Sequence, residues 1–98
     1  MSYLEELRDV VMRLHGADAK HIKSVPVKEQ HEGKTVWDGV VEVFDLTGHP
    51  KTNRVYAWAY DVSGNMRHVT VLHIPPVVSP ETAVRAAIIQ EFRDNAQA

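Results

Sequence analysis

The chain contains no cysteine, and this absence removes a whole class of architectures. Without thiols a protein has no disulfide framework, no thiolate metal site and no thiol redox chemistry, so its stability must come from packing. No apolar run approaches the roughly 20 residues that cross a bilayer, and the first residues lack the basic and apolar stretches of a secretory signal. We therefore expect a cytoplasmic protein with no membrane partner.

The chain also has little net charge. Its formal charge is −2 over 98 residues, of which 44% are hydrophobic and 24% charged. This balance is too apolar for a disordered chain and gives no global field that would attract polyanions. A chain of this length buries one modest core, so residues 1–98 are expected to form a single domain.

Two segments carry the signals of helices. Ser2 and Glu5 form a capping box, and apolar residues then recur at helical spacing until Gly16, which predicts a helix over residues 3–15. Ser79 followed by Pro80 predicts the start of a second helix. Its expected inward stripe contains Val84, Ala87, Ile88 and Phe92.

Between these helices the sequence predicts four strands, over residues 23–30, 35–46, 54–62 and 68–74. Valine and aromatic residues dominate them, and polar or glycine-containing turns separate them. Pro26 favours an edge position for the first strand, because proline cannot donate a hydrogen bond to a ladder. We expect an α+β domain with a two-layer arrangement, in which a helix, a four-stranded antiparallel meander and a second helix follow one another and both helices cover one face of the sheet.

The register between the second and third strands decides which residues share a face. If Leu46 and Arg54 close the hairpin, Phe44 lies opposite Tyr56, and Val43 lies opposite Ala57. A slip by one residue would reverse this assignment. The fourth strand has two possible registers: a two-residue turn at Gly64 and Asn65 places Val69, Val71 and His73 beside the aromatic residues, and a longer loop places His68, Thr70 and Leu72 there.

If Leu46 and Arg54 close the hairpin, we expect the helices to leave one aromatic face of the sheet uncovered. We expect this face to be a binding surface. Its members are Phe44, Tyr56, Trp58 and Tyr60, with Arg54, Lys51 and Arg67 as a polar rim. Aromatic anchors within a charged border are typical of protein interfaces. We therefore expect a small interaction domain that forms a homodimer or docks another protein, with no catalytic residue assigned.

Two alternatives remain open. The same rings resemble a stacking platform for single-stranded nucleic acid, although Glu42 beside them would repel phosphate. A small-molecule site or an enzyme centre could instead lie between helices and sheet, with His73, Asp61 or Trp37 contributing.

No metal or cofactor is expected. The six histidines lack the spacing of metal ligands on one helix or strand face, and Gly33-Lys34-Thr35 lacks the earlier glycine of a phosphate-binding loop.

Several segments together resemble a family of short bacterial proteins of uncharacterised function. They are Gly33-Lys34-Thr35-Val36-Trp37, Val41-Glu42-Val43-Phe44-Asp45-Leu46, Gly48-His49-Pro50, Tyr56-Ala57-Trp58 and Pro75-Pro76. The resemblance implies a compact bacterial α+β domain and no particular activity, cofactor or site residue.

Overall fold

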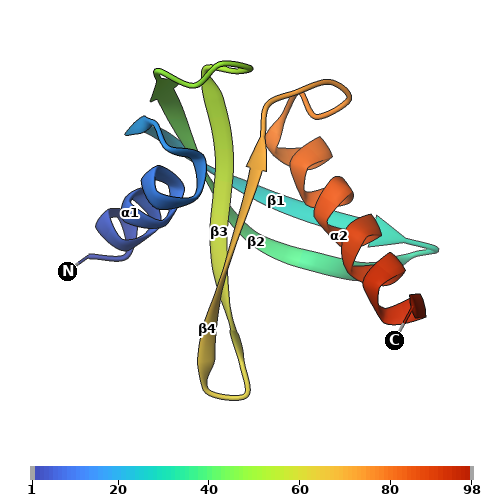
Figure 1. Cartoon of the computed structure of the whole chain (residues 1–98). Helices are drawn as coiled ribbons and strands as arrows, with labels where there is room; N and C mark the ends of the chain where they lie inside the picture. The colour runs from blue at the N-terminus through green and yellow to red at the C-terminus, as the bar shows by residue number, and fades with distance from the viewer. Residues whose placement is uncertain (1, 98) are drawn as a thin grey trace.

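The computed structural model describes residues 2–97, including every side chain there except those of residues 92 and 94–97. The elements are α1 (Tyr3–His15), β1 (Asp18–His31), β2 (Lys34–Thr47), β3 (Arg54–Val62), β4 (Asn65–Leu72) and α2 (Pro80–Gln97). The strands form one antiparallel sheet in the order β1-β2-β3-β4 (Figure 1). The expected α+β class and the order of helix, meander and helix are confirmed.

The bounds of α1 follow from its capping residues. Ser2 Oγ accepts a hydrogen bond from the Glu5 amide at 3.2 Å. Gly16, with φ of 62°, ends the helix in the left-handed conformation that glycine adopts without strain, and its amide donates to the Met12 carbonyl at 2.9 Å. The helix predicted over residues 3–15 is therefore confirmed. Within residues 2–97, no helix has both the length and the apolar character needed to cross a bilayer.

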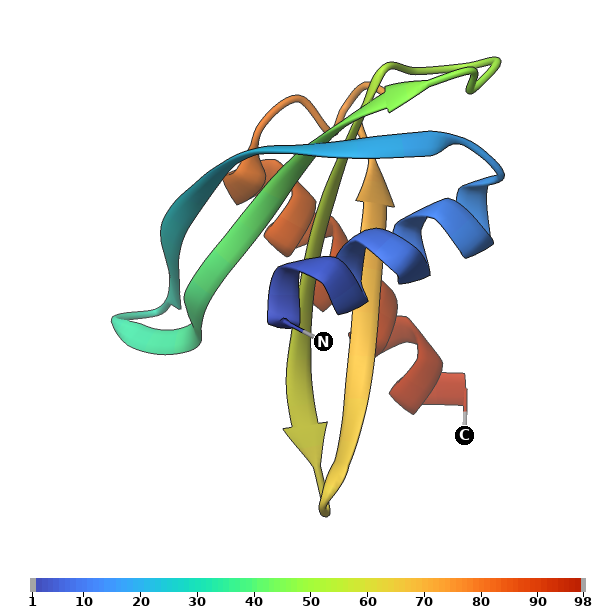
Figure 2. The ribbon, with the colours of Figure 1, turned by 90° about the vertical axis from the view of Figure 1, so that its left-hand side faces the viewer.

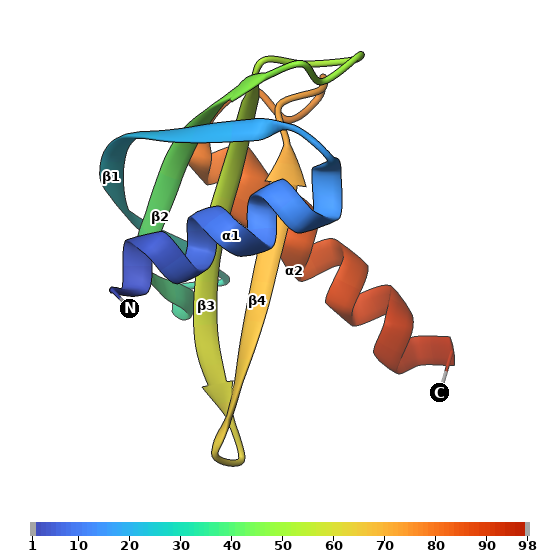
Figure 3. The same cartoon turned by 60° about the vertical axis from the view of Figure 1, so that its left-hand side comes forward.

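The two helices pack on opposite faces of the sheet (Figure 2). Leu7 and Val11 of α1 contact the face that carries Val55 and Ala57. Val84 of α2 belongs to the cluster on the other face, which carries Tyr56 and Trp58. Each helix thus packs against its own face of the sheet. Our expectation that both helices share one face is wrong. Figure 3 shows α1 in front of β3 and β4 and α2 behind them.

The expected register of β2 against β3 is also wrong by one residue. The structure pairs Phe44 with Val55, Val43 with Tyr56 and Asp45 with Arg54. An ion pair at 3.2 Å joins the Arg54 guanidinium to the Asp45 carboxylate across the two strands and stabilises this register. Phe44 consequently moves from the aromatic face to the face under α1.

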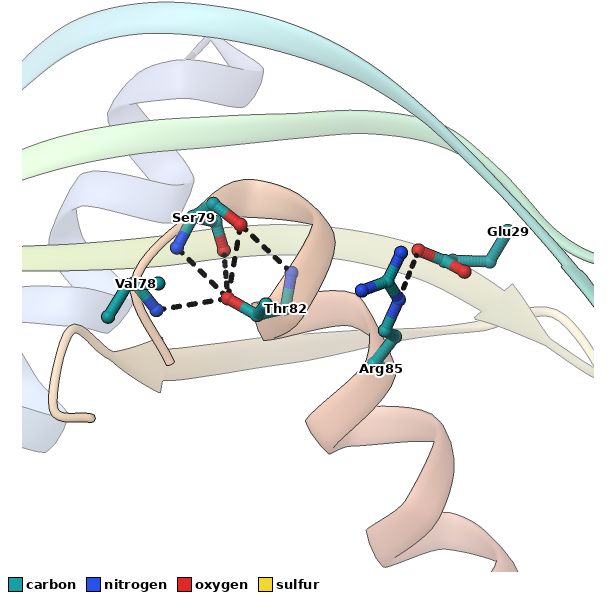
Figure 4. Close-up of polar contacts among 5 residues, drawn as sticks. All are labelled: Glu29, Val78, Ser79, Thr82 and Arg85. Atoms are coloured by element: carbon teal, nitrogen blue, oxygen red, sulfur yellow. Dashed lines mark hydrogen bonds and ion pairs between the residues drawn. The ribbon is translucent and has the colours of Figure 1, made fainter. Parts of the chain in front are cut away.

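Helix α2 starts at the position predicted from Ser79 and Pro80. The Thr82 amide donates to Ser79 Oγ at 3.2 Å, and Thr82 Oγ1 in turn accepts from the Val78 and Ser79 amides at 2.9 and 3.0 Å (Figure 4). This reciprocal cap satisfies amide groups that the first turn leaves without helical partners. The Phe92 side chain, expected on the inner stripe, lies outside the described part of the structure.

The sheet divides into two hairpins that diverge. β1 and β2 pair over most of their length, whereas β2 pairs with β3 only from Glu42 to Asp45. Beyond that short contact the two hairpins separate, and α2 lies between them (Figure 1). The Tyr3 hydroxyl accepts a hydrogen bond at 3.0 Å from the amide of Ala59. Ala59 lies in β3, two residues beyond the last residue that pairs with β2. An ion pair of 2.9 Å between Arg85 and Glu29 ties α2 to β1 (Figure 4).

The helices cover aromatic residues that we expected to be exposed: α1 covers Phe44, and α2 covers Tyr56 and Trp58. The exposed fraction is 0% for Phe44, 2% for Tyr56 and 3% for Trp58. These rings therefore belong to the core, and the expectation of an open aromatic docking face is wrong. The physical reason is that each face has a helix of its own, so neither face is left over.

Strand bounds agree with the prediction for β3 and differ elsewhere. β1 starts five residues earlier than expected, at Asp18, and β4 runs over Asn65–Leu72 instead of 68–74. The turn before β4 contains Ser63 and Gly64, with φ of 53° and 84°, the pattern of a two-residue type I′ hairpin. The turn lies one residue earlier than the Gly64-Asn65 turn of the first alternative, so that position is wrong. The face assignment of that alternative still holds, with Val69 and Val71 beside Trp58 and Tyr56.

Replacement of Trp58 by alanine tests this placement. A buried tryptophan deleted from a packed core costs about 3–5 kcal/mol of unfolding free energy, because apolar contacts are lost and a cavity remains. We expect a loss of that size for Trp58→Ala in urea denaturation followed by circular dichroism. The control Val36→Ala removes an apolar side chain that is 49% exposed and should change the free energy by no more than about 0.5 kcal/mol. Equal effects of the two substitutions would contradict the packing of Trp58 under α2.

Candidate functional site

A cleft of about 820 Å³ lies between α2 and the hairpin formed by β3 and β4. We call it the β4 cleft. Its sheet wall contains Trp58, Tyr60, Val69 and Val71. Its helix wall contains Val84, Ala87 and Ile88. The walls are therefore mainly apolar, and Arg67 and Glu91 also line the cleft.

The register of the hairpin creates the sheet wall. Trp58 lies opposite Val69, and Tyr60 lies opposite Arg67. Opposite residues of an antiparallel pair project from the same face, so a tryptophan and a valine form the floor while tyrosine and arginine stand nearer the hairpin tip. Trp58 is almost fully buried, whereas Tyr60 is half-buried. The cleft thus becomes more open toward the turn.

Trp37 of β2 closes another side of the cleft. Its ring meets that of Trp58 edge to face, with centroids 5.5 Å apart and an interplanar angle of 69°. Gly39 permits this position, because a Cβ atom there would lie only 3.0 Å from the Trp37 ring. Both tryptophans of the chain therefore line the same cleft.

The other face of β4 is hollowed as well. A second cavity, of about 490 Å³, lies between α1 and the β4 hairpin and is lined by Val10, Arg13, Leu14, Met66 and His68 among others. Leu14, Arg67 and His68 border both cavities. Because they share these lining residues, the two hollows meet at β4. Helix α1 lies on one side of β4 and α2 on the other (Figure 3).

Polar contacts hold α1 beside β4. His68 Nε2 lies 3.0 Å from a carboxylate oxygen of Glu6. Two residues further along the strand, His15 Nε2 lies 2.9 Å from Thr70 Oγ1. Burial, and then the neighbouring His49, lower the pKa of His15 from its ordinary value. Its neutral form is therefore the one that fits this position.

Among the seven residues expected to form the binding surface, Trp58, Tyr60 and Arg67 meet at the β4 cleft. The other four lie elsewhere: Phe44 is buried under α1, Tyr56 is buried under α2, Arg54 pairs with Asp45, and Lys51 is exposed in the loop before β3. Sequence reasoning did not assign Leu14 or the α2 residues to the binding surface. The first of the two registers considered for the fourth strand did place Val69 and Val71 beside the aromatic residues.

The residues considered for an enzyme centre do not converge. Asp61 accepts a hydrogen bond from the Gly64 amide at 2.8 Å and so belongs to the hairpin turn. His73 Nδ1 lies 2.6 Å from the Tyr56 hydroxyl, and burial raises the pKa of that tyrosine, which keeps its proton. Trp37 alone of the three lines the β4 cleft.

A buried carboxylate lies on the α1 face. Glu42 is 5% exposed, and one of its oxygens accepts hydrogen bonds from the Ser24 hydroxyl and from His21 Nε2, the latter at 2.9 Å. Buried charges are stable only when they are paired in this way. The contacts bridge the irregular pairing between His21 and Lys23, so the cluster has a structural role in β1. In the part of the chain that the structure describes, no three acidic or histidine side chains are grouped as metal ligands.

The position of His15 predicts how stability responds to acid. Because its pKa in the folded protein is lowered, the unfolded chain binds a proton first as the pH falls. The contribution of neutral His15 is present above about pH 6.5, the unfolded value, and is lost as the pH falls through the lower folded pKa. We expect His15→Gln to reduce the loss of unfolding free energy between pH 7 and pH 5. Denaturation curves at several pH values measure it, with His31→Gln, at the exposed end of β1, as the control. Parallel profiles for the parent protein and His15→Gln would contradict the assignment.

No protein-family model matches the chain. No curated protein and no solved structure matches it either.

Proposed function

We propose that this chain is a binding domain, and that its partner, a segment of another protein, occupies the β4 cleft. The observation that supports this proposal is the cleft itself, an apolar hollow of about 820 Å³ beside an outer strand of the sheet. Concave apolar sites with a few polar groups are typical ligand-binding sites of proteins. We assign to this cleft the binding role that we had expected for an open aromatic face.

Exposed apolar side chains around the cleft support the same proposal. Leu14 is 58% exposed and Met66 is 54% exposed, and both border the hollows around β4. Apolar side chains that gather at a hollow mark interaction sites more often than those scattered singly over a surface. Binding of single-stranded nucleic acid has less support, because Tyr56 and Trp58 are buried and offer no open ring faces to bases.

A small apolar ligand is a second candidate for the cleft. Its volume falls within the range of about 300–1,000 Å³ that is typical of small-molecule sites. The edge-to-face pair of Trp37 and Trp58 would supply an aromatic wall for such a ligand. The open edge of β4 favours a polypeptide, because an extended main chain pairs with several amides and carbonyls of that strand at once.

Substitution of Ala87 tests whether the cleft binds. Ala87 lines the cleft, so Ala87→Arg places a long charged side chain in it. The probe is Nile red, an uncharged dye that fluoresces in apolar sites. We expect the dye to bind the parent protein and to lose at least about tenfold in affinity for Ala87→Arg, which corresponds to about 1.4 kcal/mol.

The matched control is Ile89→Arg. Ile89 is 52% exposed and does not line the cleft, so the same charge is introduced on the same helix but outside the site. Dye binding should remain as in the parent protein. Equal dye binding by all three proteins, or no binding by the parent, would contradict the proposal.

A further inference from the structure

We infer that the β4 cleft binds its partner by strand addition: an extended segment of another protein pairs with β4 as a fifth strand, with apolar and acidic side chains in alternation. This inference rests on the proposed function of the cleft and names the class of its partner. It follows from three features of β4, namely its free edge, its difference from β1 and the unlike chemistry of the hollows on its two faces.

The first feature is the direction of the main-chain groups of β4. The two-residue turn makes Val62 and Asn65 a hydrogen-bonded pair, and such pairs alternate along antiparallel strands. The amide of His73 follows the same alternation, since it donates to the Arg54 carbonyl at 3.0 Å. Odd-numbered residues therefore bond to β3. The amides and carbonyls of Met66, His68 and Thr70 point outward, and within residues 2–97 no strand pairs with that edge.

The second feature is that the opposite edge of the sheet is protected and this edge is not. β1 carries Pro26, three lysines at positions 20, 23 and 28, and two irregularities in its pairing. Proline, lysine and bulges are the devices by which proteins prevent strands from pairing at an edge. β4 has neither proline nor lysine, and its pairing with β3 runs without interruption from Asn65 to Leu72. An unprotected edge that lies between two hollows is suited to receive a strand.

The third feature is the chemistry of the two hollows. Side chains of an added strand alternate between the faces, so every second residue enters the β4 cleft and the others enter the hollow beside α1. The β4 cleft is mainly apolar. The hollow beside α1 contains Arg13, which makes no ion pair with any described residue. Arg67 borders this hollow as well, but it lies opposite Tyr60 and so projects from the face of the β4 cleft. Glu6 is nearby but already bonds to His68. An unpaired guanidinium group favours a carboxylate as its partner. The added strand should therefore place apolar side chains in the β4 cleft and acidic side chains in the hollow beside α1, in alternation.

A second copy of the chain fits this edge poorly. Pairing of β4 with another β4 about a two-fold axis would place two copies of α2 on the same side of the joined sheet. In Figure 3, α2 crosses behind β4 and continues past its edge, so the two helices would collide. The partner is therefore a segment without a covering helix of its own.

Defined peptides test the inference. The probe is an eight-residue blocked peptide of alternating valine and glutamate, equal in length to β4. The control replaces every glutamate by lysine. Both tryptophans line the β4 cleft, so their fluorescence reports its occupation. We expect the glutamate peptide to bind at least tenfold more tightly than the lysine peptide, and Arg13→Glu to remove or reverse that preference.

Two N-methylated forms of the glutamate peptide test the main-chain pairing. In an antiparallel pair, residues that exchange hydrogen bonds share a face, so the glutamate amides would face β4 and the valine amides would face away. Methylation of the glutamate amides should weaken binding at least tenfold, and methylation of the valine amides should not. The reverse result would indicate a parallel strand and still support strand addition. Equal binding by both methylated peptides would overturn it.

A pair of substitutions at one position tests the same pairing from the protein side. Thr70→Pro removes an outward amide that is not used in the sheet, and Thr70→Ala keeps that amide. Both lose the hydrogen bond between Thr70 and His15. Only Thr70→Pro should lose peptide binding, with circular dichroism to confirm that each variant is folded. Should Thr70→Pro not fold, the methylated peptides decide the question alone.

The outcomes separate this inference from the proposed function. Dye binding that Ala87→Arg abolishes, together with no peptide binding, would retain a binding cleft and overturn strand addition. Loss of both would overturn both. A dimer in sedimentation that Thr70→Pro dissociates would identify a second copy as the occupant and would also overturn the inference.

Discussion

The structure depends on one constraint: both faces of the central strands are apolar, and both must be shielded from water. Val55 and Ala57 project to one side of β3, while Tyr56 and Trp58 project to the other. Burial of such side chains is the main stabilising contribution in a small domain. Each face therefore requires a helix. The placement of α1 and α2 on opposite sides is the arrangement that satisfies both requirements.

Much of the fold was predictable from local signals. Ser2, Gly16, Ser79 and Pro80 act through hydrogen bonds and dihedral angles within a few residues, so the sequence alone indicates where the helices begin and where the first one ends. The register of β2 was not predictable in this way. Residues 41–44 and 46 are all buried, so a period of two does not reveal which of them face α1. The pairing of Asp45 with Arg54 resolves the ambiguity through a contact across the loop.

The site was predictable to a smaller extent for a related reason. Alternation along β3 identified Trp58 and Tyr60 as neighbours on one face, and the structure places both at the β4 cleft. Trp37, Leu14 and Ala87 come from three other elements and reach the same cleft only because the two hairpins diverge around α2. No sequence spacing encodes such a meeting. The free edge of β4, in contrast, can be recognised in the sequence once the strand order is known.

The position of α2 also has a consequence for biosynthesis. The ribosome completes all four strands before the residues that cover Trp58 emerge, because α2 begins at Pro80. The nascent sheet therefore carries an aromatic surface that is exposed to chaperones or to misassociation until α2 has been synthesised. A chain that ended before Ala83 and Val84 would leave Tyr56 and Trp58 without the helix that covers them.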